Sequence, residues 1–182
     1  MKYYFGYDVS SSAIGVSVMD EDKKIIVSKA LLFDPKKETL EQRAQFFEQD
    51  LKIMLTKYKP CDIFVEEPAK AFGQGSSNAQ TIGTLQRFNG MICYAIYRNT
   101  KIQANLINAR SARKLVGIPY VRGLSTTQLK KYLTRHVKEM YDDFEIVYTT
   151  KGNLKRGIAD KADSVIVNLA GMKTGEEESE RT

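Results

Sequence analysis

Four acidic residues occupy places in the sequence from which their carboxylates could act together. Asp8 lies inside the first apolar run of the chain, and Glu66 directly follows a later one. Asp160 and Asp163 are three residues apart in a segment with helical periodicity, so they share one helix face. Carboxylates that are packed together repel each other, and a divalent cation removes that penalty. Oxygen donors without His or Cys favour hard ions, so we expect Mg²⁺, with Mn²⁺ as a substitute.

A pair of such ions would give these acids a defined chemistry, the hydrolysis of a phosphodiester. Two ions about 4 Å apart can activate the attacking water and stabilise the leaving 3′ oxygen. Simpler roles are also open for each acid. Asp8 could hydrogen-bond its own turn, Glu66 could be solvated at a strand end, and Asp160 suits a helix N-terminus. Glu67 is the adjacent alternative to Glu66 as a ligand.

The charge of the chain is unevenly distributed. It carries 28 basic and 22 acidic residues, a net charge of +6, whereas residues 98–161 alone hold 14 basic and 5 acidic residues, a net +9. A basic segment suggests a polyanionic partner, most simply nucleic acid, although a solvated surface explains any single residue equally well. The candidates for phosphate contacts in this segment are Arg110, Arg113, Lys114, Lys151, Lys155 and Arg156.

The composition excludes several classes of protein. The 42% of hydrophobic and 27% of charged residues are those of an ordinary globular domain, not of collagen or a low-complexity chain. No apolar run approaches the roughly 20 residues of a membrane helix. Two cysteines and one histidine, His136, make a disulfide framework or a zinc site improbable. We expect an intracellular protein, cytoplasmic or nucleoid-associated, with no membrane partner and no small-molecule cofactor.

The residue pattern predicts three antiparallel strands, then alternating helices and strands. The first three strands are expected at residues 3–9, 13–19 and 24–33. Later strands are expected at 61–65, 101–107 and, as an edge strand, 145–148. Helical periodicity marks residues 39–58, 78–98, 109–116, 125–140 and 158–171. This order predicts a single α/β or α+β layered domain over residues 1–172 with a mixed sheet, and a polar, frayed tail over residues 173–182.

Five segments, in order, resemble motifs of the RuvC-type Holliday-junction resolvases. Residues 5–15, FGYDVSSSAIG, resemble the opening strand with its G-x-D and small-residue turn. Residues 63–66, IFVE, resemble the second acidic motif, and residues 160–164, DKADS, resemble the closing D-x-A-D-A motif. Residues 85–90 and 108–117 resemble the segments between them. The resemblance spans about residues 3–171, and phage and poxvirus members of the family are the most similar in character.

The resemblance implies a fold, an activity and an assembly. The fold would be ribonuclease-H-like, α/β, with a mixed five-stranded sheet of three antiparallel strands followed by parallel strands. The protein would be a homodimer that makes paired nicks in four-way DNA junctions, encoded by a cell or by a virus acting in its host. Two Mg²⁺ ions per active site would be held by Asp8, Glu66, Asp160 and Asp163.

Other contacts follow from the resemblance less directly. The family places an aromatic wedge shortly after the second acid, where this chain has Ala69, so Phe72 is the nearest candidate. Ser11 could hydrogen-bond a DNA phosphate or simply form the turn. The helix over residues 78–98 could supply the dimer face or pack in the core.

Three other functions fit the same residues. Another nuclease of the ribonuclease-H fold, acting on forks, flaps or RNA–DNA hybrids, would use the same acids. A phosphotransferase of the actin–hexokinase type also places an Asp before a Ser/Gly turn, but such chains normally need two such domains. A non-catalytic junction-binding protein would have no reason to keep four acids. Junction resolution is therefore the leading hypothesis.

Overall fold

A five-stranded mixed sheet forms the centre of the molecule. The computed structural model describes residues 1–68 and 79–179. Strands β1 (Tyr3–Val9), β2 (Ala13–Asp20) and β3 (Ile25–Leu32) are antiparallel, whereas β4 (Pro60–Glu66) is parallel to β1 and β5 (Asn105–Ile107) is parallel to β4. The strand order is β3-β2-β1-β4-β5. The predicted α/β fold, with three antiparallel strands followed by parallel strands, is confirmed.

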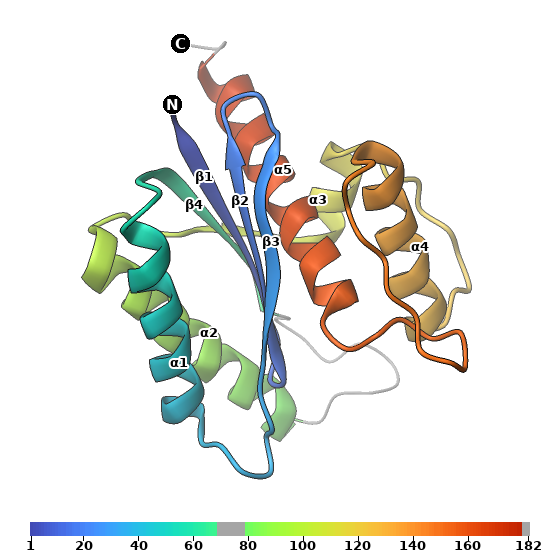
Figure 1. Cartoon of the computed structure of the whole chain (residues 1–182), viewed down its shortest axis with the longest axis horizontal. Helices are drawn as coiled ribbons and strands as arrows, with labels where there is room; N and C mark the ends of the chain where they lie inside the picture. The colour runs from blue at the N-terminus through green and yellow to red at the C-terminus, as the bar shows by residue number, and fades with distance from the viewer. Residues whose placement is uncertain (69–78, 180–182) are drawn as a thin grey trace.

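Helices cover both faces of this sheet. Helices α1 (Leu40–Leu55) and α2 (Ala79–Thr100) lie on one face, and α3 (Ala109–Leu115), α4 (Thr126–Met140) and α5 (Ile158–Ser179) lie on the other (Figure 1). Side chains cap the N-termini of three helices. Thr39 and Ser125 form capping boxes at α1 and α4, and the Asn108 side chain accepts backbone hydrogen bonds at the start of α3. None of the helices in the described ranges is long and apolar enough to cross a bilayer.

Strand alternation assigns each residue of β1 and β4 to one of two cores. Phe5 and Tyr7 of β1 pack in the core beneath α1 and α2, as do Ile63 and Val65 of β4. Phe64 packs in the other core, beneath α3, α4 and α5. Because successive side chains in a strand point to opposite faces, Asp8 and Glu66 belong to the α5 face of the sheet.

Helix α5 lies unusually close to β1 and β2. A Cβ atom at Gly15 would lie 1.8 Å from the carbonyl oxygen of Asp160, and one at Gly6 would lie 2.6 Å from that of Ser164. Two hydrogen bonds hold α5 against the strands. The Ser17 hydroxyl donates to the Ser164 carbonyl (2.9 Å), and the Asn168 amide donates to the Tyr4 carbonyl (2.9 Å). The two glycines therefore set how near α5, and its first-turn acid, comes to the strands.

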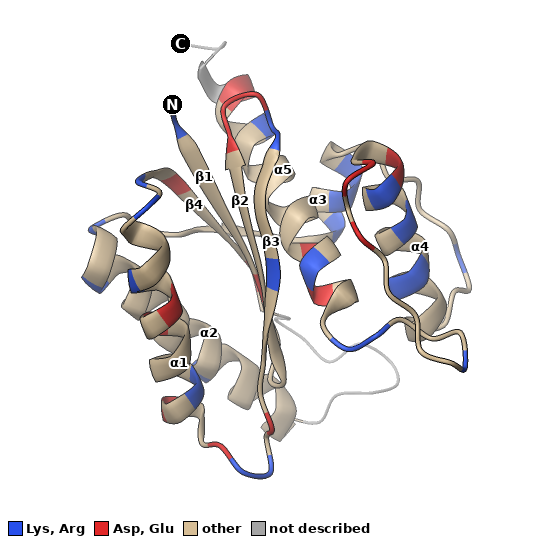
Figure 2. Ribbon diagram, in the orientation of Figure 1, with Lys and Arg blue, Asp and Glu red and all other residues tan. Residues whose placement is uncertain are grey.

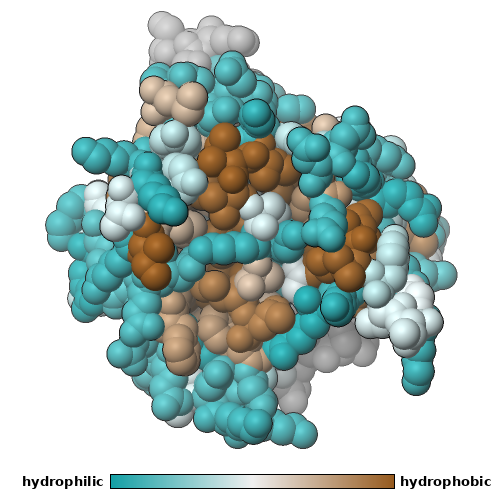
Figure 3. All heavy atoms as spheres, in the orientation of Figure 1, coloured by the Kyte–Doolittle hydropathy of each residue, from teal (hydrophilic) through white to brown (hydrophobic). Residues whose placement is uncertain are grey.

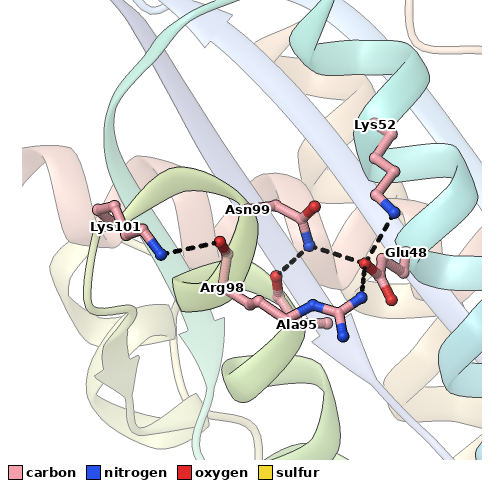
Figure 4. A network of polar contacts seen from close by, with 6 residues as sticks. All are labelled: Glu48, Lys52, Ala95, Arg98, Asn99 and Lys101. Atoms are coloured by element: carbon pink, nitrogen blue, oxygen red, sulfur yellow. Dashed lines mark hydrogen bonds and ion pairs between the residues drawn. The ribbon is translucent and has the colours of Figure 1, made fainter.

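On the opposite face a polar network joins α1 to α2. The Glu48 carboxylate accepts from Lys52 (3.0 Å), Asn99 (3.1 Å) and the Arg98 guanidinium (Figure 4). These hydrogen bonds, the one from Arg98 above all, lower the pKa of Glu48 to about 2. The network holds the two helices together at neutral pH.

Strand β3 is one edge of the sheet and is only half-buried. In the space-filling view, hydrophobic side chains gather over the middle of the face where β3 runs (Figure 3). Lys29 of β3 forms an ion pair with Asp50 of α1. A charged side chain on an edge strand discourages pairing with another chain, so this ion pair protects the edge.

Three details of the predicted elements are wrong. The strand expected at residues 101–107 is limited to β5, Asn105–Ile107. The edge strand expected at residues 145–148 is absent from the described chain there; only an isolated bridge joins Tyr148 to Leu154, because this segment makes local turns beside α5. Helix α5 continues to Ser179 instead of ending at Gly171, and residues 173–179 are helical instead of frayed. Gly171 does not end the helix: a Cβ there would lie 2.2 Å from the Phe64 ring, so glycine makes room for that ring.

Candidate active site

The fold brings the four acids to one end of the sheet. Asp8 and Glu66 are near the carboxyl ends of the adjacent parallel strands β1 and β4, where Tyr7 is in register with Val65. Asp160 and Asp163 lie in the first turns of α5, which packs on the same face. Their charges act on one another: Glu66, Asp163 and Asp160 all act on Asp8. The structure thus places all four predicted acids at the same end and on the same face of the sheet.

The cluster is electrostatically strained. Burial, and then the charge of Glu66 and the two aspartates of α5, raises the pKa of Asp8 well above its ordinary value. Burial, followed by the charge of Asp163, raises the pKa of Glu66 to about 7. Burial is also the main cause that raises the pKa of Asp163 to about 6, with a contribution from Asp160. Such mutual repulsion is the penalty that a bound cation relieves.

Two basic residues oppose this repulsion. Arg113 of α3 acts to lower the pKa of Glu66 and of Asp163. Lys130 of α4 acts in the same direction on Asp8 and Asp163. Arg113 is predicted from the sequence but Lys130 is not, because a helix with several lysines does not show which of them faces the acids. Lys130 is therefore a candidate site residue that only the tertiary arrangement reveals.

The acids suit a hard divalent cation by donor type. They offer only carboxylate oxygens, which Mg²⁺ and Mn²⁺ accept. Within residues 1–68 and 79–179, no three His, Cys, Asp or Glu side chains converge into a closed metal-ligand set. Beyond burial, the neighbouring acids contribute to the raised pKa values of Asp8, Glu66 and Asp163, yet the four carboxylates do not converge on a common point. The oxygen donors of the four carboxylates fit such an ion, and the carboxylates would have to move nearer together to bind one.

A buried amide fixes the end of β4. The Asn89 side chain, which is 4% exposed on α2, donates to the Glu66 carbonyl oxygen at 3.0 Å. The next residue is held as well, because the Glu67 amide N–H donates to the Ile107 carbonyl at 2.9 Å. Both bonds position the backbone that carries the Glu66 side chain. Asn89 belongs to residues 85–90, one of the segments that resemble the resolvase family.

Two arginines hold the serine turn that follows Asp8. Arg43, which is buried, donates to the Ser11 carbonyl, and Arg156 donates to the Ser12 carbonyl at 2.9 Å and to the Phe33 carbonyl. The Ser10 hydroxyl closes the turn by donating to the Ala13 carbonyl at 2.9 Å. Arg156, proposed from the sequence as a phosphate contact, is thus engaged with the backbone.

The other predicted contact residues occupy two regions on the α5 side. Arg110, Arg113 and Lys114 line a cavity between α3 and α4. Lys151 and Lys155 are exposed on the segment that leads into α5, and basic residues mark this segment and α4 in Figure 2. Ser11 is half-buried in the turn after β1. Phe72 lies outside the described residues.

Comparison with known proteins gives a likeness in fold only. The sequence matches no protein-family model and no curated protein. The structure resembles that of Thermus thermophilus RuvC in complex with a Holliday junction substrate, with a TM-score of 0.70 and 12% identity over 97% of this chain and 96% of that one. It also resembles Ydc2, the yeast mitochondrial Holliday junction resolvase, with a TM-score of 0.56 and 14% identity over 97% of this chain and 80% of that one. The chain therefore has the RuvC-type, ribonuclease-H-like fold along nearly its whole length.

Proposed function

We propose that this protein is a Mg²⁺-dependent endonuclease that resolves four-way DNA junctions by paired nicks. One observation carries the proposal: Asp8, Glu66, Asp160 and Asp163 all lie at one end of a RuvC-type sheet, near enough for the other three to add to the effect of burial in raising the pKa of Asp8. A domain without a metal would gain nothing from this cluster, since the repulsion is unfavourable to folding. Of the two similar structures described above, one is RuvC bound to a Holliday junction and the other is a protein named as a Holliday junction resolvase.

Different residues of the chain would bind the metal, bind the reacting phosphate and position the acids. Asp8, Glu66, Asp160 and Asp163 would hold the metal, which supplies activation of water and stabilisation of the leaving 3′ oxygen. Arg113 and Lys130 already lie close enough to act on the acids, so they are placed to bind the oxygens of the reacting phosphate. Asn89 holds the β4 backbone so that the Glu66 carboxylate keeps its place.

The DNA arms would lie over the α5 side of the molecule. Lys151 and Lys155 are exposed on the segment before α5, and Arg110 and Lys114 are exposed on α3. Lysine and arginine side chains that neutralise backbone phosphates give affinity without reading sequence. These four residues would therefore set the position of the duplex arms.

A homodimer would match the two-fold symmetry of the substrate. Two exposed tyrosines of α2, Tyr94 (65% exposed) and Tyr97 (53% exposed), offer an aromatic patch on the side opposite α5. A symmetric dimer presents the same patch from both copies and gives one active site per cut strand. Tyr94→Asp should shift sedimentation from dimer to monomer, whereas an unchanged sedimentation coefficient would remove α2 from the interface.

A panel of substrates tests the proposed activity. Wild-type protein and Asp8→Asn would meet an immobile four-way junction, a fork, a flap, an RNA–DNA hybrid and a plain duplex, with Mg²⁺ or with EDTA. We expect wild type with Mg²⁺ to nick the junction, and Asp8→Asn to bind it without cutting. Preferential cutting of forks, flaps or hybrids would instead indicate another nuclease of the same fold. Tight junction binding without any cutting would indicate a non-catalytic protein.

A further inference from the structure

A large cavity adjoins the acid cluster. It has a volume of about 870 Å³ and opens between α3, α4 and the segment that joins them, residues 116–125. This volume is within the range of about 300–1,000 Å³ that is typical of small-molecule sites. The phosphate contacts proposed above use only its cationic rim, Arg110, Arg113 and Lys114, and leave its apolar side without a role.

The lining of the cavity is of two kinds. Arg110, Arg113 and Lys114 of α3 supply a cationic side. The other side is apolar and aromatic, formed by residues of α4 and of the joining segment, among them Tyr120 and Leu129. A cationic side alone would suit any anion, and an apolar side alone would suit any hydrophobic group. Together they fit a planar, apolar group that carries a phosphate.

The apolar and aromatic side of the cavity is held rigidly at its base and is exposed at its rim. The Tyr132 hydroxyl donates to the Pro119 carbonyl at 2.9 Å, and its ring stands edge-on to His136 with centroids 4.5 Å apart. Tyr120 lies one residue after Pro119 and is 81% exposed, so its ring is available to a ligand. An aromatic ring at the rim of a rigid pocket is suited to stacking against a base.

Arg113 connects the cavity to the acids. It lines the cavity from α3, and α3 packs against α5, the helix that carries Asp160 and Asp163. A DNA strand whose scissile phosphate lies at the acids would therefore pass Arg113. The nucleotide next to that phosphate would then reach the cavity.

We propose that this cavity holds one unstacked nucleotide next to the scissile phosphate, its base against Tyr120 and its phosphate on Arg110 and Lys114. The inference rests on the proposed function, since it takes the ligand to be part of the DNA that is cut. Charge complementarity favours this occupant: an apolar peptide or a second copy of this basic surface would leave three cations without anionic partners. At the branch point the strands pass from one duplex arm to another and continuous base stacking is interrupted, so taking a base out of the stack costs less there than inside a duplex.

A double-mutant cycle between protein and DNA tests the inference. An abasic residue is placed at each nucleotide around the scissile phosphate in turn, and kcat/KM is measured for wild type, Tyr120→Ala, Tyr120→Phe and Tyr148→Ala. Tyr148 is the matched control, an exposed tyrosine that does not line the cavity. Junction affinity is measured in parallel on the Asp8→Asn background, and free deoxynucleoside monophosphate is added as a competitor.

We expect Tyr120→Ala to lower kcat/KM for the intact junction roughly tenfold, within the range measured for base–aromatic stacking. At one abasic position the same substitution should have no further effect, because the partner of the ring is already missing. Tyr120→Phe and Tyr148→Ala should behave as wild type, and free nucleotide should compete only weakly. Equal losses from Tyr120→Ala at every abasic position would overturn the inference, as would strong competition by the free nucleotide. If no DNA is cut at all, the proposed function fails, and the same coupling in affinity still decides whether the cavity holds a base.

Discussion

At the scale of single residues, the central feature is a set of carboxylates that hold protons more tightly than free ones do. Glu66 has a pKa of about 7 and Asp163 one of about 6, both raised first by burial. In an unfolded chain the same groups would have released their protons by about pH 4 to 5. Folding therefore favours protonation of this cluster, and its ionisation opposes folding.

This linkage fixes the sign of a pH effect. Because the folded pKa values are raised, the contribution of the cluster to stability is present below about pH 4 and is lost as the pH rises to about 7. Without metal, Asp8→Asn replaces a carboxyl whose ionisation is opposed by burial and by the neighbouring acids, and it should melt roughly 2–8 °C above wild type at pH 7.5, if about 1–2 kcal/mol is relieved. Melting scans in EDTA from pH 5 to pH 8 check this. Parallel pH profiles for the two proteins would contradict it.

Added Mg²⁺ should stabilise the folded protein more as the pH rises, whereas without metal the cluster becomes more destabilising as the pH rises. A cation binds the ionised carboxylates, so binding competes with their protonation and strengthens as the pH rises. We expect the increase in melting temperature caused by Mg²⁺ to be larger at pH 8 than at pH 6, and to vanish in Asp8→Asn. A shift of equal size in both proteins would show that Mg²⁺ acts elsewhere.

At the scale of elements, the distance between α5 and the sheet decides where two of the four acids lie. Gly15 is in register with Asp8, and a Cβ at Gly15 would lie 1.8 Å from the carbonyl oxygen of Asp160. An alanine there cannot be accommodated unless α5 moves away from β2. The glycine thus couples the spacing of two elements to the geometry of the site.

Gly15→Ala should therefore damage activity more than stability. Overpacking costs about 1–3 kcal/mol, whereas displacing catalytic groups by about 1 Å can cost roughly 100-fold in rate. Melting temperature and junction cleavage would be measured together. Gly175→Ala in α5 is the control, because a Cβ there meets open space. If Gly15→Ala cuts at the normal rate, the spacing of α5 does not control the site.

The elements also show what the sequence could and could not predict. Alternation along β1 and β4 predicts that Asp8 and Glu66 share a face, and helical spacing predicts the same for Asp160 and Asp163. Those inferences need only local periodicity. The role of Lys130 depends on how α4 packs against α5, and only the packed structure shows that Gly171 makes room for the Phe64 ring instead of ending α5. The cavity arises from the path of residues 116–125, which no periodicity encodes.

At the scale of the whole molecule, charge and shape divide the protein into two sides. Basic residues of α3, α4 and the segment before α5 lie on the side of the acids (Figure 2), whereas α1 and α2 cover the other side of the sheet (Figure 1). The net charge of +6 thus acts mainly where the substrate would bind. Electrostatic attraction to DNA should govern affinity on that side.

Salt dependence measures this attraction. The logarithm of junction affinity should fall linearly with the logarithm of salt concentration, by about 0.9 for each phosphate neutralised on duplex arms. Lys151→Ala should make the slope shallower by about that amount. Lys57→Ala, an exposed lysine just beyond the end of α1, should leave the slope unchanged. Equal slopes for all three proteins would exclude Lys151 from the phosphate contacts.

The central claim, paired nicking of a junction by two copies of this acid cluster, is tested most directly on a supercoiled plasmid that extrudes a cruciform. Two coordinated nicks across the junction convert the plasmid straight to linear DNA, whereas a single nick releases the supercoils, reabsorbs the cruciform and leaves an open circle. With Mg²⁺ we expect linear product from wild type and none from Asp8→Asn. Open circles alone, or linear product from Asp8→Asn, would contradict the proposed mechanism.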